Sequence, residues 1–137
     1  MSKSMISVGI IAQNKRARRD YDIIDTYEAG IVLTGSEVKS LRRGQGNIME
    51  AYAVYEDDGI YLINSYIPNY NEAKNFGHED RRKRKVLLHQ KEIIKLSNDV
   101  ARKGMTLVPL SLYFNKKGLA KLKVGLGKGR TGIDKRN

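Results

Sequence analysis

The strongest constraint on the fold is a strict alternation of apolar and charged residues near the C-terminal end. Between residues 119 and 126, apolar side chains at the even positions alternate with Lys121 and Lys123. A strand places successive side chains on opposite faces of a sheet, so the apolar ones can fill a core while the lysines meet solvent or phosphate. Met105–Phe114 is also strand-like, and Asn115-Lys116-Lys117-Gly118 between the two runs is typical of a hairpin turn.

The first half of the chain predicts another hairpin, a long strand and a short helix. Ala51–Tyr55 and Ile60–Tyr66 flank an Asp-Gly turn, which is a hairpin signal. Tyr21–Leu33 is rich in Ile, Val, Thr and Tyr and predicts a strand, in which Gly30 indicates a bulge or tight bend. Thr34-Gly35-Ser36-Glu37 has the spacing of a capping box and predicts a helix of about two turns.

The segment between the two hairpins has mixed signals. One proline, one glycine and three asparagines in residues 67–80 predict a loop. Arg81–Lys85 then begins a helical region, with apolar residues at helical spacing from Ile93 to Val100. Because Ser97-Asn98-Asp99 can break and recap a helix, we expect two short helices, the second ending at Lys103-Gly104.

This order of elements predicts a mainly β fold with short helices. Antiparallel strands in this number close into a small barrel or a sandwich, and we favour a partly open barrel. A length of 137 residues with 40% apolar content suits one compact domain. We assign residues 13–126 to the barrel, 1–12 to a mobile N-terminal segment and 127–137 to a flexible basic C-terminal segment.

Composition also bounds the compartment. The absence of cysteine excludes disulfides and thiolate metal sites. The apolar run at residues 5–12 is short and continues directly into Lys15-Arg16, unlike a signal peptide. No stretch reaches the roughly 20 apolar residues of a membrane span. We therefore expect a cytoplasmic protein with no membrane partner, and a monomer.

Positive charge is concentrated toward the two ends of the chain. The net charge is +11, with +5 in residues 1–19, −8 in residues 20–80 and +14 in residues 81–137. Such a distribution favours a polyanionic partner, because each neutralised phosphate releases counterions. A soluble protein with an ordinary basic surface is the alternative. The candidate RNA-binding cations are Lys15, Arg16, Arg18, Arg82, Arg84, Lys85, Lys121, Lys123, Lys128 and Arg130.

Three other residue patterns could in principle bind a metal ion or a nucleotide, but none of them predicts such a site. His78-Glu79-Asp80 is better explained as a polar loop than as metal ligands, because adjacent residues rarely converge on one ion. Glu56-Asp57-Asp58 fits a turn better than half of a nuclease site. Gly125–Gly132 lacks the Gly-Lys-Ser/Thr order of a phosphate loop. We expect no catalytic residues, metal or cofactor.

Six motifs, in order along the chain, resemble the SmpB family, over roughly residues 12 to 136. The most specific is Glu-Ala-Gly at 28–30 followed by Gly-x-Glu-Val-Lys-Ser-Leu-Arg at 35–42. The others are Asn14-Lys15-Arg16-Ala17-Arg18, Arg84-Lys85-Val86-Leu87-Leu88, Leu112-Tyr113-Phe114, and Gly127-Lys128-Gly129-Arg130 followed by Asp134-Lys135-Arg136.

This resemblance implies an oligonucleotide-binding (OB)-type, partly open Greek-key β-barrel with about three flanking α-helices. Proteins of this family bind the tRNA-like domain of tmRNA, also called SsrA RNA, and bring it to stalled ribosomes in trans-translation. They stand in the place of the anticodon arm that tmRNA lacks, and the nascent chain is then tagged for proteolysis. The partners implied are tmRNA and the ribosomal RNA near the decoding centre.

Three family RNA contacts match single positions of this chain. They are Glu28, which would accept hydrogen bonds from base or sugar donors, Leu87, an apolar contact to an unstacked base or ribose, and Lys121, a phosphate contact. The resemblance also implies ribosome contacts near the end of the chain, at Ile133, Asp134, Lys135 and Arg136.

The chain departs from the family pattern at two places. It carries Ile133 where the family often has His or Tyr, and the family's usual long basic tail does not follow. We expect RNA binding by the barrel to survive both departures. A general ribosome-binding or tRNA-binding accessory protein without tmRNA specificity, and a nuclease using Glu56, Asp57 or Asp58, stay as alternatives.

Overall fold

Alternating strands build one antiparallel sheet in the computed structural model, which describes residues 9–56, 59–69 and 78–130. In these ranges the elements are β1 (Ile10–Gln13), α2 (Ala17–Asp20), β2 (Tyr21–Ile31), α3 (Gly35–Arg42), β3 (Tyr52–Glu56), β4 (Gly59–Ile63), β5 (Arg84–Leu87), α4 (Gln90–Lys103), β6 (Thr106–Phe114) and β7 (Ala120–Gly129). Both predicted hairpins are present, as β3–β4 and β6–β7.

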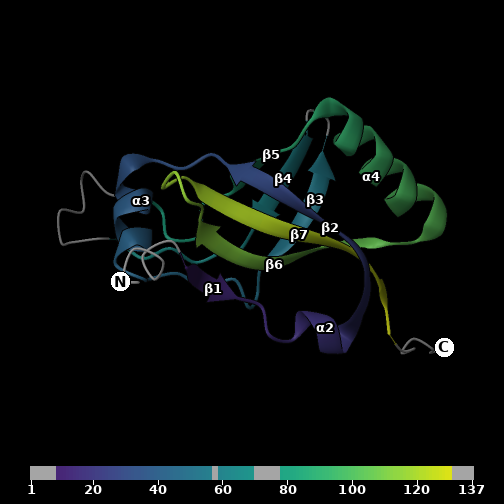
Figure 1. Cartoon of the computed structure of the whole chain (residues 1–137), viewed down its shortest axis with the longest axis horizontal. Coiled ribbons are helices and arrows are strands. Elements are labelled where there is room, and N and C mark those ends of the chain that lie inside the picture. Colours follow the sequence, from purple (N-terminus) through teal and green to yellow (C-terminus); the bar gives the residue numbers. More distant parts are fainter. Residues whose placement is uncertain (1–8, 57–58, 70–77, 131–137) are drawn as a thin grey trace.

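The seven strands have the order β1-β6-β7-β2-β5-β4-β3. Figure 1 shows β2 and β7 running together across the molecule, with α3 and α4 near opposite ends of that pair. Within the described ranges β1 and β3 are the edges, and no strand pairing joins them. The mainly β architecture with three helices is therefore confirmed, whereas closure of the sheet into a barrel is not.

One face of the sheet, which we call the inner face, is covered by the core. Leu122 and Val124 of β7 point inward, together with Leu96 from α4 and Leu41 from α3. The opposite, outer face carries a smaller apolar cluster at one end, where buried Ala17 of α2 packs on β6. Beyond this cluster the outer face carries charged side chains such as Lys121 and Lys123 together with the exposed Leu87.

The segment that begins at Arg81 differs from its prediction. It forms strand β5 instead of a helix. Arg84 and Val86, two residues apart, are both buried, and Leu87 is exposed, which is the two-residue period of a strand. A buried arginine hides the two-residue period of a strand in the sequence.

Helix α4 is continuous, whereas two short helices were expected. The side chain of Ser97 donates back to the carbonyl of Ile94 at 3.0 Å, and Asp99 pairs with Lys95 at 3.2 Å and Lys103 at 3.5 Å. These polar residues are thus satisfied inside the helix. Its predicted end is confirmed, since Gly104 has the left-handed conformation that terminates a helix, with φ 65°.

Of the two alternatives predicted for Gly30, a bulge or a tight bend, the bulge is wrong, because the irregularity of β2 lies between Ile23 and Asp25. Gly30 instead pairs in register with Lys121 on one side and Leu87 on the other. A Cβ atom at this position would lie 3.4 Å from the Cβ of Leu87, so the glycine allows that side chain to lie close over the strand.

The paired sheet is also longer than predicted at both ends. β1 begins at Ile10, inside the segment expected to be mobile, and β7 continues to Gly129, inside the segment expected to be flexible. The predicted capping box is confirmed: the Thr34 amide donates to Glu37 Oε1 at 2.8 Å, and the Glu37 amide donates to Thr34 Oγ1 at 3.3 Å.

Candidate nucleic-acid interface

The register of three central strands places the family contact residues on one face. Lys123 of β7 lies opposite Glu28 of β2, and Lys121 lies opposite Gly30, which in turn lies opposite Leu87 of β5. Leu122 between the lysines is fully buried, so both lysines belong to the outer face. A carboxylate, an exposed leucine and two lysines from three neighbouring strands therefore form one surface.

Tyr113 of β6 completes this surface, although the sequence did not identify it as a contact residue. It lies opposite Lys121 in the β6–β7 register, and its hydroxyl donates a hydrogen bond to Glu28 Oε2. Because β7 lies between β6 and β2, the side chain of Tyr113 reaches across that strand. Partial burial and the bond to Glu28 raise the pKa of Tyr113 well above its usual range, so the phenol remains a donor.

The tyrosine fixes the carboxylate of Glu28 and leaves its other oxygen available. An ionised carboxylate accepts hydrogen bonds only, so Glu28 suits a ribose 2′-hydroxyl or a base amino group and not a phosphate. Lys121 and Lys123 place two positive charges beside this carboxylate on the same face. The predicted turn over residues 115–118 would pair position 113 with position 120, whereas the loop spans residues 115–119 and pairs Tyr113 with Lys121. The predicted register therefore could not have revealed Tyr113.

The N-terminal basic cluster meets the same surface at a depression of about 470 Å³. Lys15 and Arg18 line it together with Lys123, beside Ile10 and Leu110. The backbone amide and the side-chain amide of Asn14 hold this segment on β6, donating to the Leu110 carbonyl at 2.9 Å and the Pro109 carbonyl at 3.1 Å. Three cations from two distant parts of the chain thus line one concavity, an arrangement that suits phosphate.

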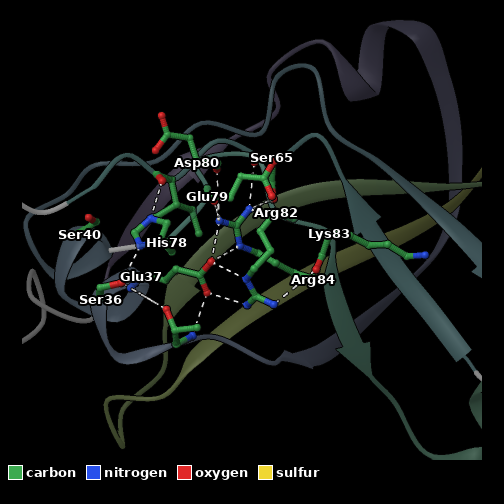
Figure 2. A network of polar contacts seen from close by, with 12 residues as sticks. Ser36, Glu37, Ser40, Ser65, His78, Glu79, Asp80, Arg82, Lys83 and Arg84 are labelled. Carbon is green, nitrogen blue, oxygen red and sulfur yellow. Dashed lines mark hydrogen bonds and ion pairs between the residues drawn. The ribbon is translucent and has the colours of Figure 1, made fainter. Parts of the chain in front are cut away.

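Beneath this surface lies a buried polar network, which Figure 2 shows around Glu37. Glu37 Oε2 accepts from Arg82 Nε and Arg84 Nε, each at 2.9 Å, and Glu37 Oε1 accepts from Arg82 Nη2 at 2.8 Å. Arg84 Nη1 donates to the carbonyl of Ser65 at 3.0 Å and to its hydroxyl at 2.9 Å. The network therefore joins the first turn of α3 to β5 and to the segment after β4.

The charge state of Glu37 follows from these partners. Burial alone would raise its pKa, but hydrogen bonds from Arg82, the Thr34 amide and Arg84 outweigh it and lower the pKa to about 2. Burial lowers the pKa of Arg84, and the bond to Glu37 opposes that effect. Glu37 is thus a carboxylate held between two guanidinium groups inside the fold.

Several residues predicted to contact RNA do not lie on the outer face. Arg84 is fully buried and fully engaged, so the predicted RNA contact there is corrected to an internal ion pair. Arg82 lies partly exposed on the same carboxylate. Arg16 lines a different depression, beside Asp20 and Tyr52.

Two predicted contact residues at the end of β7 also do not join the surface around Glu28. Lys128 has the parity of the buried Leu126 and so belongs to the opposite side of the strand from Lys123. Arg130 pairs with Asp22 at 3.5 Å. Lys85 shares the outward parity of Leu87. Ile133, Asp134, Lys135 and Arg136 lie outside the described residues.

The residues considered for metal or nuclease chemistry have structural partners. His78 Nδ1 lies 2.6 Å from Ser36 Oγ, and its Nε2 lies 2.7 Å from the Ile67 carbonyl oxygen. Glu56 pairs with Lys83 at 2.6 Å, whereas Asp57 and Asp58 lie outside the described residues. In the part of the chain that is described, no three His, Cys, Asp or Glu side chains are grouped to hold a metal ion.

None of the helices within the described ranges combines the length and apolar character needed to cross a membrane.

Comparison with known proteins identifies the family of this chain. The sequence profile of the family described as SmpB protein matches residues 11–137. The chain belongs to the SmpB family. Two relatives, each named SsrA-binding protein, come from Agrobacterium fabrum and Sinorhizobium medicae. They are 58% and 55% identical over 127 residues, which is 93% of this chain and 79% and 80% of the relatives.

A solved SmpB-family structure has the same fold. It is described as "tmRNA-SmpB: a journey to the center of the bacterial ribosome" and superposes with a TM-score of 0.74 at 48% sequence identity. The match covers 91% of this chain and 87% of the other.

Proposed function

We propose that this chain binds the tRNA-like domain of SsrA RNA, or tmRNA, and delivers it to stalled ribosomes in trans-translation. The observation that carries the proposal is the register that brings Glu28, Leu87 and Lys121 from three strands to one outer face. Relatives that are more than half identical over the 127 aligned residues are named SsrA-binding protein. The surface has the groups that such a partner requires: cations for phosphate, a carboxylate for sugar or base donors, and an exposed leucine.

In this proposal each part of the surface has its own task. Lys121, Lys123, Lys15 and Arg18 contact phosphates and supply most of the affinity. Glu28, oriented by Tyr113, accepts from a 2′-hydroxyl or an amino group, which favours RNA over DNA. Leu87, 49% exposed, contacts an unstacked base or a ribose. Recognition is then led by the shape of a folded RNA and not by its sequence.

Three further features belong to the same proposal. β3 lies close to β6, so the open sheet curls back on itself in the manner of a partly open OB-type barrel. A task on ribosomes places the chain in the cytoplasm. Residues 133–136 then contact ribosomal RNA, with Ile133 providing apolar contact where the family often has an aromatic ring.

The test is binding to a tRNA-like tmRNA fragment over a salt series. Lys121→Ala is expected to weaken binding and to reduce the slope of log K against log salt by about one, since one phosphate contact is lost. Lys91→Ala is the matched control, because this exposed lysine lies on α4, which covers the inner face. An unchanged slope for Lys121→Ala would contradict its phosphate contact.

A competition experiment separates this function from general tRNA binding. Bulk tRNA should displace the tmRNA fragment poorly if the surface is specific for tmRNA. Equal displacement by both would instead identify a translation accessory protein without tmRNA specificity. Magnesium-dependent cleavage of either RNA by the pure protein would contradict both and favour a nuclease.

A further inference from the structure

A second concavity lies beside Lys121, next to the β6–β7 turn, where the outer face meets α3. Its volume is about 420 Å³, within the range of ligand pockets. Gly30, Leu87, Leu119, Phe114 and Arg42 line it together with Lys121. Apart from Arg42 and Lys121, every lining side chain is apolar or absent; the rest of the lining is Ile31, Leu33, Val38, Gly118 and Ala120.

The walls of this groove expose apolar surface that the core does not use. Leu87 is 49% exposed and Leu119 is 55% exposed. Exposed leucines occur singly on many surfaces, but these two face the same groove. The turn that carries Leu119 is held in place, since Asn115 Oδ1 accepts from the Leu119 amide at 2.9 Å. The groove is therefore formed before any partner binds.

Arg42 is held over the groove in an orientation that leaves charge available. Its guanidinium lies 4.7 Å from the centre of the Phe114 ring, and Nη2 donates to the carbonyl of Gly118 at 3.1 Å. No carboxylate of the described residues forms an ion pair with it. Several of its donors thus remain for an anion at one rim, while Lys121 lies at another.

We propose that this groove receives one unstacked base of the bound RNA, while Arg42 and Lys121 contact the adjoining phosphates. The proposal rests on the RNA-binding function proposed above and adds Arg42, Phe114 and Leu119 to it. An apolar floor suits the face of a base, and a cationic rim suits the phosphates on either side of it. The groove also shares Leu87 and Lys121 with the proposed RNA surface.

The charges argue against a second copy of this chain as the occupant. Each copy carries a net charge of +11, and a contact at this rim would bring two cationic surfaces together.

The lining also predicts how selective the groove is among the four bases. Because the walls have no hydrogen-bonding side chain besides the two cations, the groove selects an unstacked base without regard to its identity.

The protein side of the test uses Leu119→Ser and Arg42→Gln in the full chain, with the tRNA-like tmRNA fragment as the probe. Leu119→Ser is expected to weaken binding by about tenfold with an unchanged salt slope, since an apolar contact is lost and no phosphate contact. Arg42→Gln should also reduce the slope by about one. Ile94→Ser is the matched control, because Ile94 is 52% exposed but lies on α4.

The RNA side replaces single loop nucleotides of the fragment by abasic ones. One position is expected to weaken binding to the wild-type protein by about tenfold and to have no further effect on Leu119→Ser. If the wild type binds but both variants bind equally well, the groove is not a base site, although the RNA-binding function stands. If the wild type does not bind, both proposals fail. Dissociation of a dimer by Leu119→Ser in sedimentation would also overturn the base site.

Discussion

Replacing Glu37 by glutamine should destabilise the fold severely. The carboxylate is fully buried and holds Arg82 and Arg84 at 2.8 Å. The Arg84 side chain has no exposed surface, so the variant leaves its charge inside the fold without a counterion. Removing one partner of a buried ion pair typically costs about 3–5 kcal/mol. A protein of this size has about 5–15 kcal/mol of stability in total, so the loss is a large fraction of it.

The pKa of Glu37 gives a second value for the contribution of this carboxylate to the free energy of unfolding. Its pKa falls from the ordinary 4.5 to about 2 in the folded protein. Since one pKa unit corresponds to about 1.4 kcal/mol, ionisation of this group stabilises the fold by about 3 kcal/mol. This agrees with the lower end of the range for a broken buried pair.

The same pKa gives the pH dependence. Because the folded pKa is depressed, the stabilisation is fully present above pH 4.5 and is lost as the pH falls through 2. Glutamine resembles the protonated acid, so the difference in free energy of unfolding between wild type and Glu37→Gln should be largest near pH 7. This difference should become steadily smaller below pH 4.5.

Urea unfolding followed by circular dichroism at pH 7 and pH 3 measures both effects. Glu56→Gln is the matched control, since Glu56 also pairs with a cation but is 43% exposed. This control should lose less than about 1 kcal/mol. The reasoning is refuted if Glu37→Gln loses no more than Glu56→Gln, or if its loss is the same at both pH values.

Three further changes test other parts of the structure. Tyr113→Phe should weaken tmRNA binding about three- to tenfold without changing the salt slope, and should have no effect in a Glu28→Ala background, because the phenol acts through that carboxylate; equal effects in both backgrounds would contradict this. Gly125→Val should lower stability by about 1–3 kcal/mol in thermal unfolding, since its Cβ would lie 3.0 Å from Leu110. Lys128→Ala should leave the tmRNA salt slope unchanged, because this residue lies on the opposite side of its strand.

Local patterns predicted the outer face well. The alternation around Lys121 and Lys123 correctly indicated which side chains of β7 point outward, because the two-residue period of a strand is a local property. The partners of the residues in β6 did not follow from the sequence, because the loop spans residues 115–119 and β6 is irregular between Pro109 and Ser111. The pairing of β2 with β7, which brings Glu28 opposite Lys123, joins residues far apart in sequence, and no local pattern indicates it.

The buried network was beyond local reasoning for a specific reason. Arg81–Lys85 reads as one exposed basic cluster, yet Arg84 is interior because Glu37, 47 residues earlier, supplies its counterion. Glu37 already had a sufficient local explanation as the capping-box residue of α3. It performs both tasks, and nothing in the spacing of residues around it indicates the second.

The position of this network explains why a fold would keep charges in its interior. Buried ion pairs are often no more stabilising than well-packed apolar residues, so stability alone is a weak reason for them. Glu37 lies in the first turn of α3, and Arg42 lies in the last. Arg84 and Leu87 begin and end the same short strand, β5. The network therefore ties α3, which carries Arg42, to β5, which carries Leu87, and both residues line the proposed base groove. Directional hydrogen bonds fix the separation and orientation of these two elements, which apolar packing would leave freer, and the proposed contacts of Arg42 and Leu87 with one nucleotide require both to be fixed.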